Sequence, residues 1–123
     1  MQGVYPTAVD EAWVAIDAGR IINMDRVRSQ MEGSVIFGMS LALHGSITMR
    51  NGATVQSNFK DSRLVRMTDA PRAIHVDVTR SDELSGGVGE PGVPPVAPAI
   101  ANAVFALTGQ RVRDLPLAPL FVG

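Results

Sequence analysis

The sequence predicts an α+β fold with one long helix, a β-hairpin and further strands, a loop rich in glycine and proline, and a C-terminal helix. Three observations lead to this prediction. Apolar residues recur every four positions between about Asp25 and His44, as in an amphipathic helix. The dipeptide Asn51-Gly52 separates two strand-like segments and is a strong hairpin signal. Residues 73–79 alternate apolar and polar side chains, as a half-buried strand does.

The composition is that of a globular protein with little net charge. The chain has 123 residues, of which 46% are hydrophobic and 19% charged, and its formal net charge is −1. This length suits a single domain. The absence of a basic field argues against nucleic acid as a partner. Because the sequence contains no cysteine, a cysteine-ligated iron–sulfur cluster or thiolate zinc site is excluded from this chain.

The sequence also bears on where the protein resides. No segment approaches the roughly 18 consecutive apolar residues that a membrane-spanning helix needs. The N-terminal residues lack the cationic start and apolar centre of a signal peptide. We therefore expect a cytoplasmic protein that does not span a membrane. Export in company with a partner stays an open alternative.

The chain is expected to begin with an irregular segment and a short strand. Residues 1–12 are mixed in composition and are interpreted as an irregular lead-in, so that the domain proper spans 13–123. A short β-compatible segment follows at 13–17. Asp17 is expected to bond the turn that Gly19 makes, because aspartate side chains commonly accept hydrogen bonds from backbone groups two residues further on.

The long helix is expected to have recognisable ends. Asn23 or Asp25 can cap its first turn, and Gly45 can end it. Gly33 and Gly38 lie inside the helix, where each costs up to about 1 kcal/mol relative to alanine. These two small residues indicate that another segment packs closely against the helix backbone.

A hairpin and further strands are expected after the helix. The hairpin strands are predicted at 46–50 and 53–56, and the less regular segment 57–66 is interpreted as a strand with a bend. In the alternating strand that follows, His75 and Asp77 share one face. The order of these elements favours a sheet with an antiparallel component.

The last third of the chain is expected to hold a loop, a helix and an extended tail. Within the loop 81–95, seven of the last ten residues are glycine or proline. A helix is predicted from Val96 to Leu107, with Pro95 in its first turn and Gly109 as its C-terminal cap. The tail that follows is expected to be extended because its prolines disfavour a helix.

Glu90 is the first candidate for chemistry because of the residues around it. Three glycines precede it within four positions, and Pro91, Pro94 and Pro95 follow it. Glycine permits close backbone approach, and proline removes the freedom that glycine leaves. A stiffened turn of this kind can hold one carboxylate in place, as a general base requires. The alternative is a solvated glutamate in a surface linker, which composition alone favours.

Gln30 is the second candidate. It lies in the first turns of the long helix. A glutamine amide offers both donors and an acceptor to the edge of a pterin or to an oxo group, and nearby helix N-terminal amides favour anionic groups such as phosphate. The alternative is an ordinary glutamine on the helix surface, and the sequence pattern taken alone favours it.

Four other conspicuous side chains are given structural roles. His44 ends a helix, where it can interact with the helix dipole. His75 is interpreted as a half-exposed residue of the alternating strand. Trp13 and Phe105 are expected to lie in the core. None of the four is predicted to take part in catalysis.

Four segments together resemble one known family. IDAGRIIN, QMEGSVIFGMSLAL, SNFKDSRLVRM with DAPR, and GGVGEPGVPPVAPAIANAVFALTGQRVRDLPL occur in this order. They resemble the C-terminal part of the molybdenum-binding large subunit of the xanthine dehydrogenase and aldehyde oxidoreductase family. The resemblance is strongest to the branch of the isoquinoline 1-oxidoreductase β subunit and nicotinate-dehydrogenase-like proteins. It covers about residues 13–117, and the GVGEPGVPPVAPAIANA string is its most specific part.

The resemblance implies a function, a cofactor and partners. Such proteins use a molybdenum pterin dinucleotide, here molybdopterin cytosine dinucleotide, to oxidise an aldehyde or N-heterocycle with oxygen from water. Glu90 would be the base that takes the proton from a hydroxyl on molybdenum. Gln30, Val88 and Gly89 would lie against the cofactor. The family's large subunits are several times longer, so the cofactor would be shared with the remainder of the large subunit, and an iron–sulfur small subunit would be a further partner.

Two other interpretations stay open. The chain can be a non-catalytic structural protein or truncated remnant with the same fold and no cofactor. It can also be a small-molecule binding module that catalyses no reaction. Copurified molybdenum together with partner chains would favour the enzyme, whereas a stable metal-free monomer would favour the structural protein.

Overall fold

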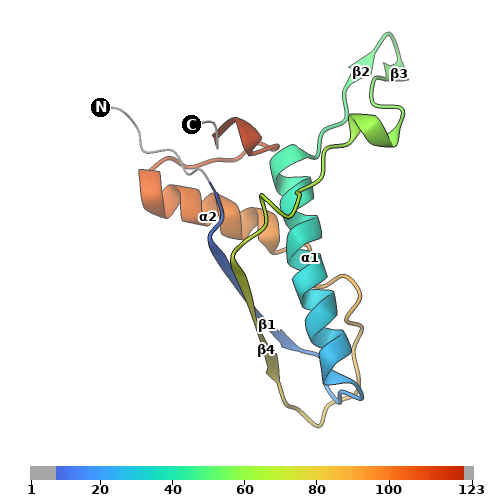
Figure 1. Cartoon of the computed structure of the whole chain (residues 1–123), viewed down its shortest axis with the longest axis vertical. Coiled ribbons are helices and arrows are strands. Elements are labelled where there is room, and N and C mark those ends of the chain that lie inside the picture. The colour runs from blue at the N-terminus through green and yellow to red at the C-terminus, as the bar shows by residue number, and fades with distance from the viewer. Residues whose placement is uncertain (1–7, 121–123) are drawn as a thin grey trace.

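The computed structural model describes residues 8–120, in which one long helix lies along a two-stranded sheet (Figure 1). In chain order the elements are β1 (Glu11–Asp17), α1 (Met24–His44), β2 (Met49–Arg50), β3 (Ala53–Thr54), the 3-10 turn η1 (Phe59–Asp61), β4 (Ala73–Thr79), α2 (Val96–Thr108) and the 3-10 turn η2 (Ala118–Leu120). This mixture of helices and small sheets confirms the predicted α+β class.

The larger sheet pairs two strands that lie far apart in the sequence. β1 and β4 are parallel, in a register that places Glu11 opposite Ala73 and Trp13 opposite His75. Among residues 8–120, the expected antiparallel component is present only in the hairpin, where β2 pairs with β3. β1 begins two residues earlier than predicted, inside the expected lead-in, because its pairing with β4 starts at Glu11. The connection from β1 to β4 carries α1, as parallel pairing requires a crossover.

Helix α1 confirms the predicted long helix and both of its predicted ends. The side chain of Asn23 accepts a hydrogen bond from the Arg26 backbone N–H at 3.0 Å, which makes Asn23 the N-cap. Gly45 follows the last residue, and its N–H donates to the carbonyl of Leu41 at 2.9 Å. Within residues 8–120, no helix is long and apolar enough to cross a bilayer.

The core lies where α1, α2, β4 and the tail meet. Its buried members include Val35 and Met39 of α1 together with Val96, Ile100 and Val104 of α2. The three α2 residues recur every four positions and so form one buried stripe of that helix. The helix ends at Gly109, whose φ of 73° is the left-handed conformation expected of a glycine cap.

The hairpin turn is confirmed, although its strands are shorter than expected. Asn51 and Gly52 have φ values of 51° and 78°, as a type I′ turn requires. Beyond the two-residue strands, the Val55 N–H donates to the Thr48 carbonyl at 2.9 Å. The hairpin extends away from the rest of the chain (Figure 1).

The prediction of a strand within 57–66 is wrong. The Asp61 carboxylate accepts hydrogen bonds from the backbone N–H groups of Ser57 and Asn58, at 3.1 and 3.2 Å. These contacts form a capping box around η1. They bind the backbone locally and so compete with strand pairing.

The tail is less extended than predicted. The Leu117 N–H donates to the Ala42 carbonyl at 2.8 Å, and the Leu117 side chain is fully buried. A 3-10 turn follows at 118–120 and includes Pro119. Proline is tolerated there because the first turn of a helix leaves its N–H groups unpaired.

The predicted core positions of Trp13 and Phe105 are also wrong. Trp13 is 73% exposed because it lies on the face of β1 that points away from α1. Its ring stacks on that of His75, with 5.1 Å between the centroids. Phe105 is partly exposed, and the Arg111 guanidinium lies 3.8 Å above its ring centroid.

Candidate functional site

The loop that carries Glu90 is anchored at its start to the turn after β1. The Asp17 carboxylate accepts hydrogen bonds from the Gly19 N–H at 3.0 Å and the Ser81 hydroxyl at 2.8 Å, which confirms the predicted role of Asp17. These two donors, the Gly19 N–H first, lower the pKa of Asp17 below its ordinary value. The Gly86 N–H donates to the Ala18 carbonyl at 2.9 Å. The loop is therefore fixed at both 81 and 86.

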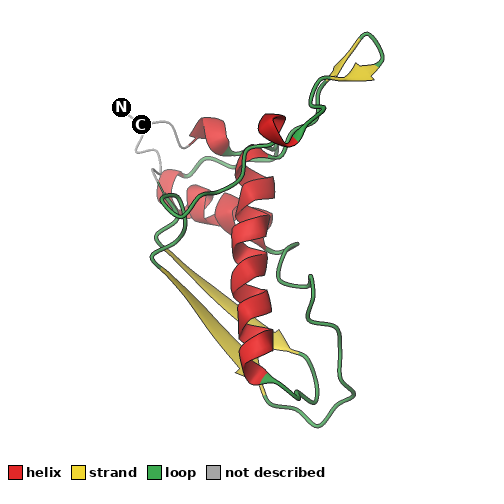
Figure 2. Cartoon of the chain, turned by 45° about the vertical axis from the view of Figure 1, so that its right-hand side comes forward, coloured by secondary structure: helices red, strands yellow, loops and turns green. Residues whose placement is uncertain are grey.

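The loop then runs along α1 on the side away from the sheet (Figure 2). Gly92 is buried against this helix. A Cβ added at Gly92 would lie 2.7 Å from the Ser34 Cβ and 3.2 Å from the Met31 sulfur. Only glycine allows this approach, so Gly92 is the second anchor of the loop.

A tight turn places Glu90 between these anchors. The Val93 N–H donates to the Glu90 carbonyl at 2.9 Å, which closes a turn with Pro91 at its second position. Proline fixes φ near the value that this position needs. Glu90 is therefore the first residue of a turn stiffened by Pro91 and held against α1 by Gly92.

The Glu90 side chain is exposed and lines an open hollow of about 800 Å³. The rest of the lining is apolar or glycine and consists of Phe37, Gly87, Gly89, Pro91, Val93 and Pro94. Phe37 comes from α1 and is itself half exposed. A carboxylate thus lies beside an apolar wall, on a surface that another group or polypeptide can reach.

The other predicted residues lie on the same side of the chain but are less closely grouped. Gln30 is exposed on α1, seven residues before Phe37, and two turns of helix place these residues on one face roughly 10 Å apart along the axis. Gly89 lines the hollow, whereas Val88 is half-buried and does not. The structure therefore brings Gly89 and Glu90 together and leaves Gln30 at a distance along the helix.

The hollow has features that fit one side of a large bound group. No atoms lie within 4 Å of a Cβ added at Gly87 or Gly89, so the backbone there is open to close approach. Among residues 8–120, no group of three or more histidine, cysteine, aspartate or glutamate side chains could hold a metal ion. The described residues thus offer a carboxylate, an amide and open backbone, but no metal ligand set.

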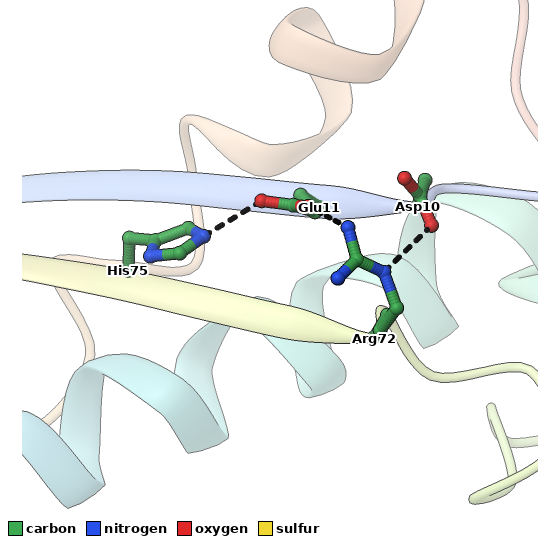
Figure 3. Close-up of polar contacts among 4 residues, drawn as sticks. All are labelled: Asp10, Glu11, Arg72 and His75. Atoms are coloured by element: carbon green, nitrogen blue, oxygen red, sulfur yellow. Dashed lines mark hydrogen bonds and ion pairs between the residues drawn. The ribbon is translucent and has the colours of Figure 1, made fainter.

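The structure contains a second polar cluster, which the sequence did not predict. Glu11 lies between Arg72 and His75 (Figure 3). It forms an ion pair with Arg72 and a 2.7 Å hydrogen bond with His75 Nε2. Arg72 Nε also approaches Asp10 at 3.5 Å. The alternation of side chains along each strand indicates which residues share a face. The cluster forms only because β1 pairs with β4, and no local sequence pattern predicts that pairing.

The family model for the molybdopterin cofactor-binding domain matches residues 4–71. That match covers more than half of the chain. This chain belongs to the molybdopterin cofactor-binding domain family. The resemblance to xanthine dehydrogenase-family large subunits is thereby confirmed. Glu90 and its loop lie outside the residues that the family model matches.

Relatives of this molybdopterin cofactor-binding domain extend over most of the chain. Isoquinoline 1-oxidoreductase subunit beta of Brevundimonas diminuta is 39% identical over 112 residues, covering 91% of this chain and 14% of the relative. The aldehyde oxidoreductase molybdenum-binding subunit PaoC of Escherichia coli is 36% identical over 107 residues, covering 81% of this chain and 15% of that subunit. The chain thus spans about a seventh of the length of these relatives.

A solved structure shares the fold. The crystal structure of quinoline 2-oxidoreductase from Pseudomonas putida 86 aligns with a TM-score of 0.76 and 19% sequence identity. The alignment covers 89% of this chain and 15% of that one. At this identity the likeness concerns the fold alone.

Proposed function

We propose that this chain is the C-terminal part of the large subunit of a molybdenum hydroxylase that oxidises an aldehyde or N-heterocycle with oxygen from water. The observation that carries the proposal is the position of Glu90. Its carboxylate lies at an open hollow, in a proline-stiffened turn between two anchored segments. The membership of the chain in a molybdopterin cofactor-binding family supports this assignment.

Glu90 is the proposed general base. It would accept the proton from the water-derived hydroxyl group as a C–O bond replaces a C–H bond of the substrate, and the two electrons released would pass to the bound cofactor. A general base must be held within hydrogen-bond distance of the proton that it removes. Anchoring at Gly86 and Gly92 limits how far the Glu90 backbone can move. The apolar wall next to the carboxylate, which includes Phe37, reduces competition from bulk water once the hollow is covered.

The proposed cofactor is a molybdenum pterin dinucleotide, in its cytosine form. When bound, this cofactor supplies the two-electron redox centre of the reaction. Gln30 would hold it through the side-chain amide, which offers donors and an acceptor. Gly89 and Val88 would contribute backbone close to it, and the open space at Gly89 allows that approach. Because the chain spans about a seventh of its relatives' length, we expect the cofactor to be shared with other polypeptide.

The proposed partners follow from the size of the chain. It spans 14% of a relative named as a subunit, so we expect the remainder of the large subunit to complete the site and select a small aldehyde or N-heterocyclic substrate. An iron–sulfur small subunit would accept the electrons. We expect no turnover by the chain alone, and we expect the assembly in the cytoplasm.

The substitution Glu90→Gln tests the role of Glu90 in the assembled enzyme. Glutamine keeps the size of the side chain and removes its ability to accept a proton, so kcat should fall roughly 100-fold to 10,000-fold. Molybdenum content should stay unchanged, because Glu90 is not proposed to bind the metal. Glu83→Gln is the matched control, since Glu83 is an exposed glutamate earlier in the same loop. It should leave kcat and molybdenum content unchanged.

The other outcomes are equally informative. Normal turnover in the Glu90→Gln enzyme would remove the proposed base. An assembled wild-type complex that is free of molybdenum would instead support the non-catalytic structural protein. Loss of molybdenum in Gln30→Ala, with normal content in Glu90→Gln, would support separate roles for the two residues.

A further inference from the structure

We propose that the free edge of β1 accepts a third β-strand, supplied by the remainder of the large subunit and lying in the groove between β1 and α2. This inference rests on the proposed function only in taking the rest of that subunit as the partner. It concerns a groove distinct from the Glu90 hollow: no residue lines both, although Gly92 and Pro95 of the Glu90 loop line the groove.

The groove has the geometry of a strand-binding site. Its volume is about 750 Å³, and the eight consecutive residues 8–15 line it. Successive side chains of a strand point to opposite faces of the sheet. Of the lining residues, 11–15 are consecutive in β1, and consecutive strand residues all line one groove when it runs along the edge of the strand, where the backbone N–H and C=O groups are accessible. β1 therefore presents its backbone edge to this groove.

Helix α2 forms the other wall of the groove. Its lining residues include Ala99, Ala103 and Leu107, which follow one face of the helix at intervals of four. Ala99 and Ala103 are exposed, and Leu107 is 56% exposed. Small side chains at 99 and 103 leave room for another backbone, while Leu107 offers apolar surface to its side chains. The wall thus suits a strand with apolar residues on one face.

The sheet itself is incomplete within the described residues. β1 pairs only with β4, so the sheet has two parallel strands. Parallel sheets are found almost entirely in larger, covered arrangements, and two strands alone are marginal. The β1 sequence EAWVAID contains no lysine or proline, which commonly protect a free edge, and its two charged residues, Glu11 and Asp17, lie at the ends of the strand. Its edge is thus suited to pairing.

The remainder of the large subunit is the occupant that best fits this groove. The chain spans 14% of its relative isoquinoline 1-oxidoreductase subunit beta, so most of such a subunit lies outside it. A single extended segment can enter between β1 and α2. The β1 strand of a second copy would bring its own α2 into the same groove, because both elements line it. We therefore assign the groove to the missing polypeptide and not to a second copy.

To test this, this chain and the remainder of its large subunit are produced together as two polypeptides. The amount of the remainder that copurifies with this chain is then measured. Ala103→Trp fills the groove from an exposed position and so spares the core. We expect roughly a tenfold or greater weakening of association, because overpacking a closely packed contact is costly. Ala106→Trp is the control: it makes the same change at an exposed position of α2 that does not line the groove. It should associate normally.

Each outcome either supports or overturns the inference. Normal copurification of Ala103→Trp, or equal loss in both variants, would overturn it. Failure of the wild-type chain to associate with the remainder would overturn it too, as would a dimer of the chain alone that Ala103→Trp abolishes. Protection of β1 backbone amides from hydrogen exchange on association, absent in Ala103→Trp, would support it. Wild-type assembly without molybdenum would count against the proposed function and leave this inference standing.

Discussion

At the scale of single residues, Asp17 links the chain's first strand to the loop that carries Glu90. Its carboxylate accepts hydrogen bonds from Gly19 and Ser81, so one side chain joins two segments more than 60 residues apart. Gly19 takes a φ of 68°, and a Cβ there would lie 2.2 Å from the Leu84 carbonyl oxygen. Both the backbone conformation of the turn and its contact with Leu84 therefore require glycine at position 19.

The lowered pKa of Asp17 predicts a specific pH dependence. Hydrogen bonds from Gly19 first, and then Ser81, hold the pKa of Asp17 below its ordinary value. The ionised form therefore stabilises the folded state fully above about pH 4, the ordinary aspartate range, and this contribution is lost as pH falls through the lowered pKa. Asp17→Asn should reduce stability at pH 7 and flatten its decline in acid. Denaturant unfolding of the variant and the wild type, at pH 7 and in acid, measures the difference in stability.

The control for this prediction is Asp77→Asn. Asp77 is exposed on β4, and no hydrogen bond or ion pair to its side chain is found within residues 8–120. Its substitution should leave the acid dependence almost unchanged. If both variants showed the same acid profile as the wild type, the hydrogen bonds of Asp17 would not contribute to stability.

At the scale of elements, α1 holds the site by packing against both α2 and the loop that carries Glu90. Its buried residues Val35 and Met39 belong to the core with α2, while Met31 and Ser34 receive Gly92 of the loop. Phe37, one turn after Ser34 on the exposed side of this contact, lines the Glu90 hollow. The position of the proposed base thus depends on how closely other segments approach this helix.

The two glycines inside α1 should respond in opposite ways to alanine. A Cβ at Gly38 would lie 2.6 Å from the Val96 side chain, whereas nothing lies within 4 Å of one at Gly33. Gly33→Ala should stabilise the fold by up to about 1 kcal/mol through helix propensity. Gly38→Ala should destabilise it by about 1–3 kcal/mol through overpacking. Thermal or denaturant unfolding of the two variants checks both signs, and equal stabilisation would contradict the close packing of α2 on α1.

At the scale of the whole molecule, the described residues expose much apolar surface. Trp13, Ile22, Phe59, Met67 and Leu84 are all more than 70% exposed. They occur on the sheet, on the turn before α1, near the hairpin and in the loops. Exposure of this kind agrees with a chain that spans about a seventh of its relatives' length.

This exposure predicts how the isolated chain behaves. The chain alone should bind a hydrophobic dye such as anilinonaphthalene sulfonate, because such dyes report accessible apolar surface. Adding the remainder of the large subunit should lower dye fluorescence severalfold, as the apolar surface becomes buried. A fluorescence titration measures this change. Dye binding that is low in the free chain, or unchanged on assembly, would contradict the idea that these surfaces are interfaces.

The sequence by itself determined the elements whose signals are local. The caps at Asn23 and Gly109, the turn at Asn51-Gly52 and the two helices could be predicted because neighbouring residues decide them. The Glu90 loop was likewise evident from one glycine–proline string, and the family from four segments of the sequence. The roles of Glu90, Gln30, Val88 and Gly89 stay predictions.

Only the tertiary structure decided what depends on distant residues. The parallel pairing of β1 with β4 joins positions about 60 residues apart, and it exposes Trp13, which composition alone would bury. The contact of Gly92 with α1 and the groove beside β1 likewise follow from how segments meet in space. Side-chain periodicity specifies which residues share a face, but the partner of that face depends on long-range packing that no local pattern encodes.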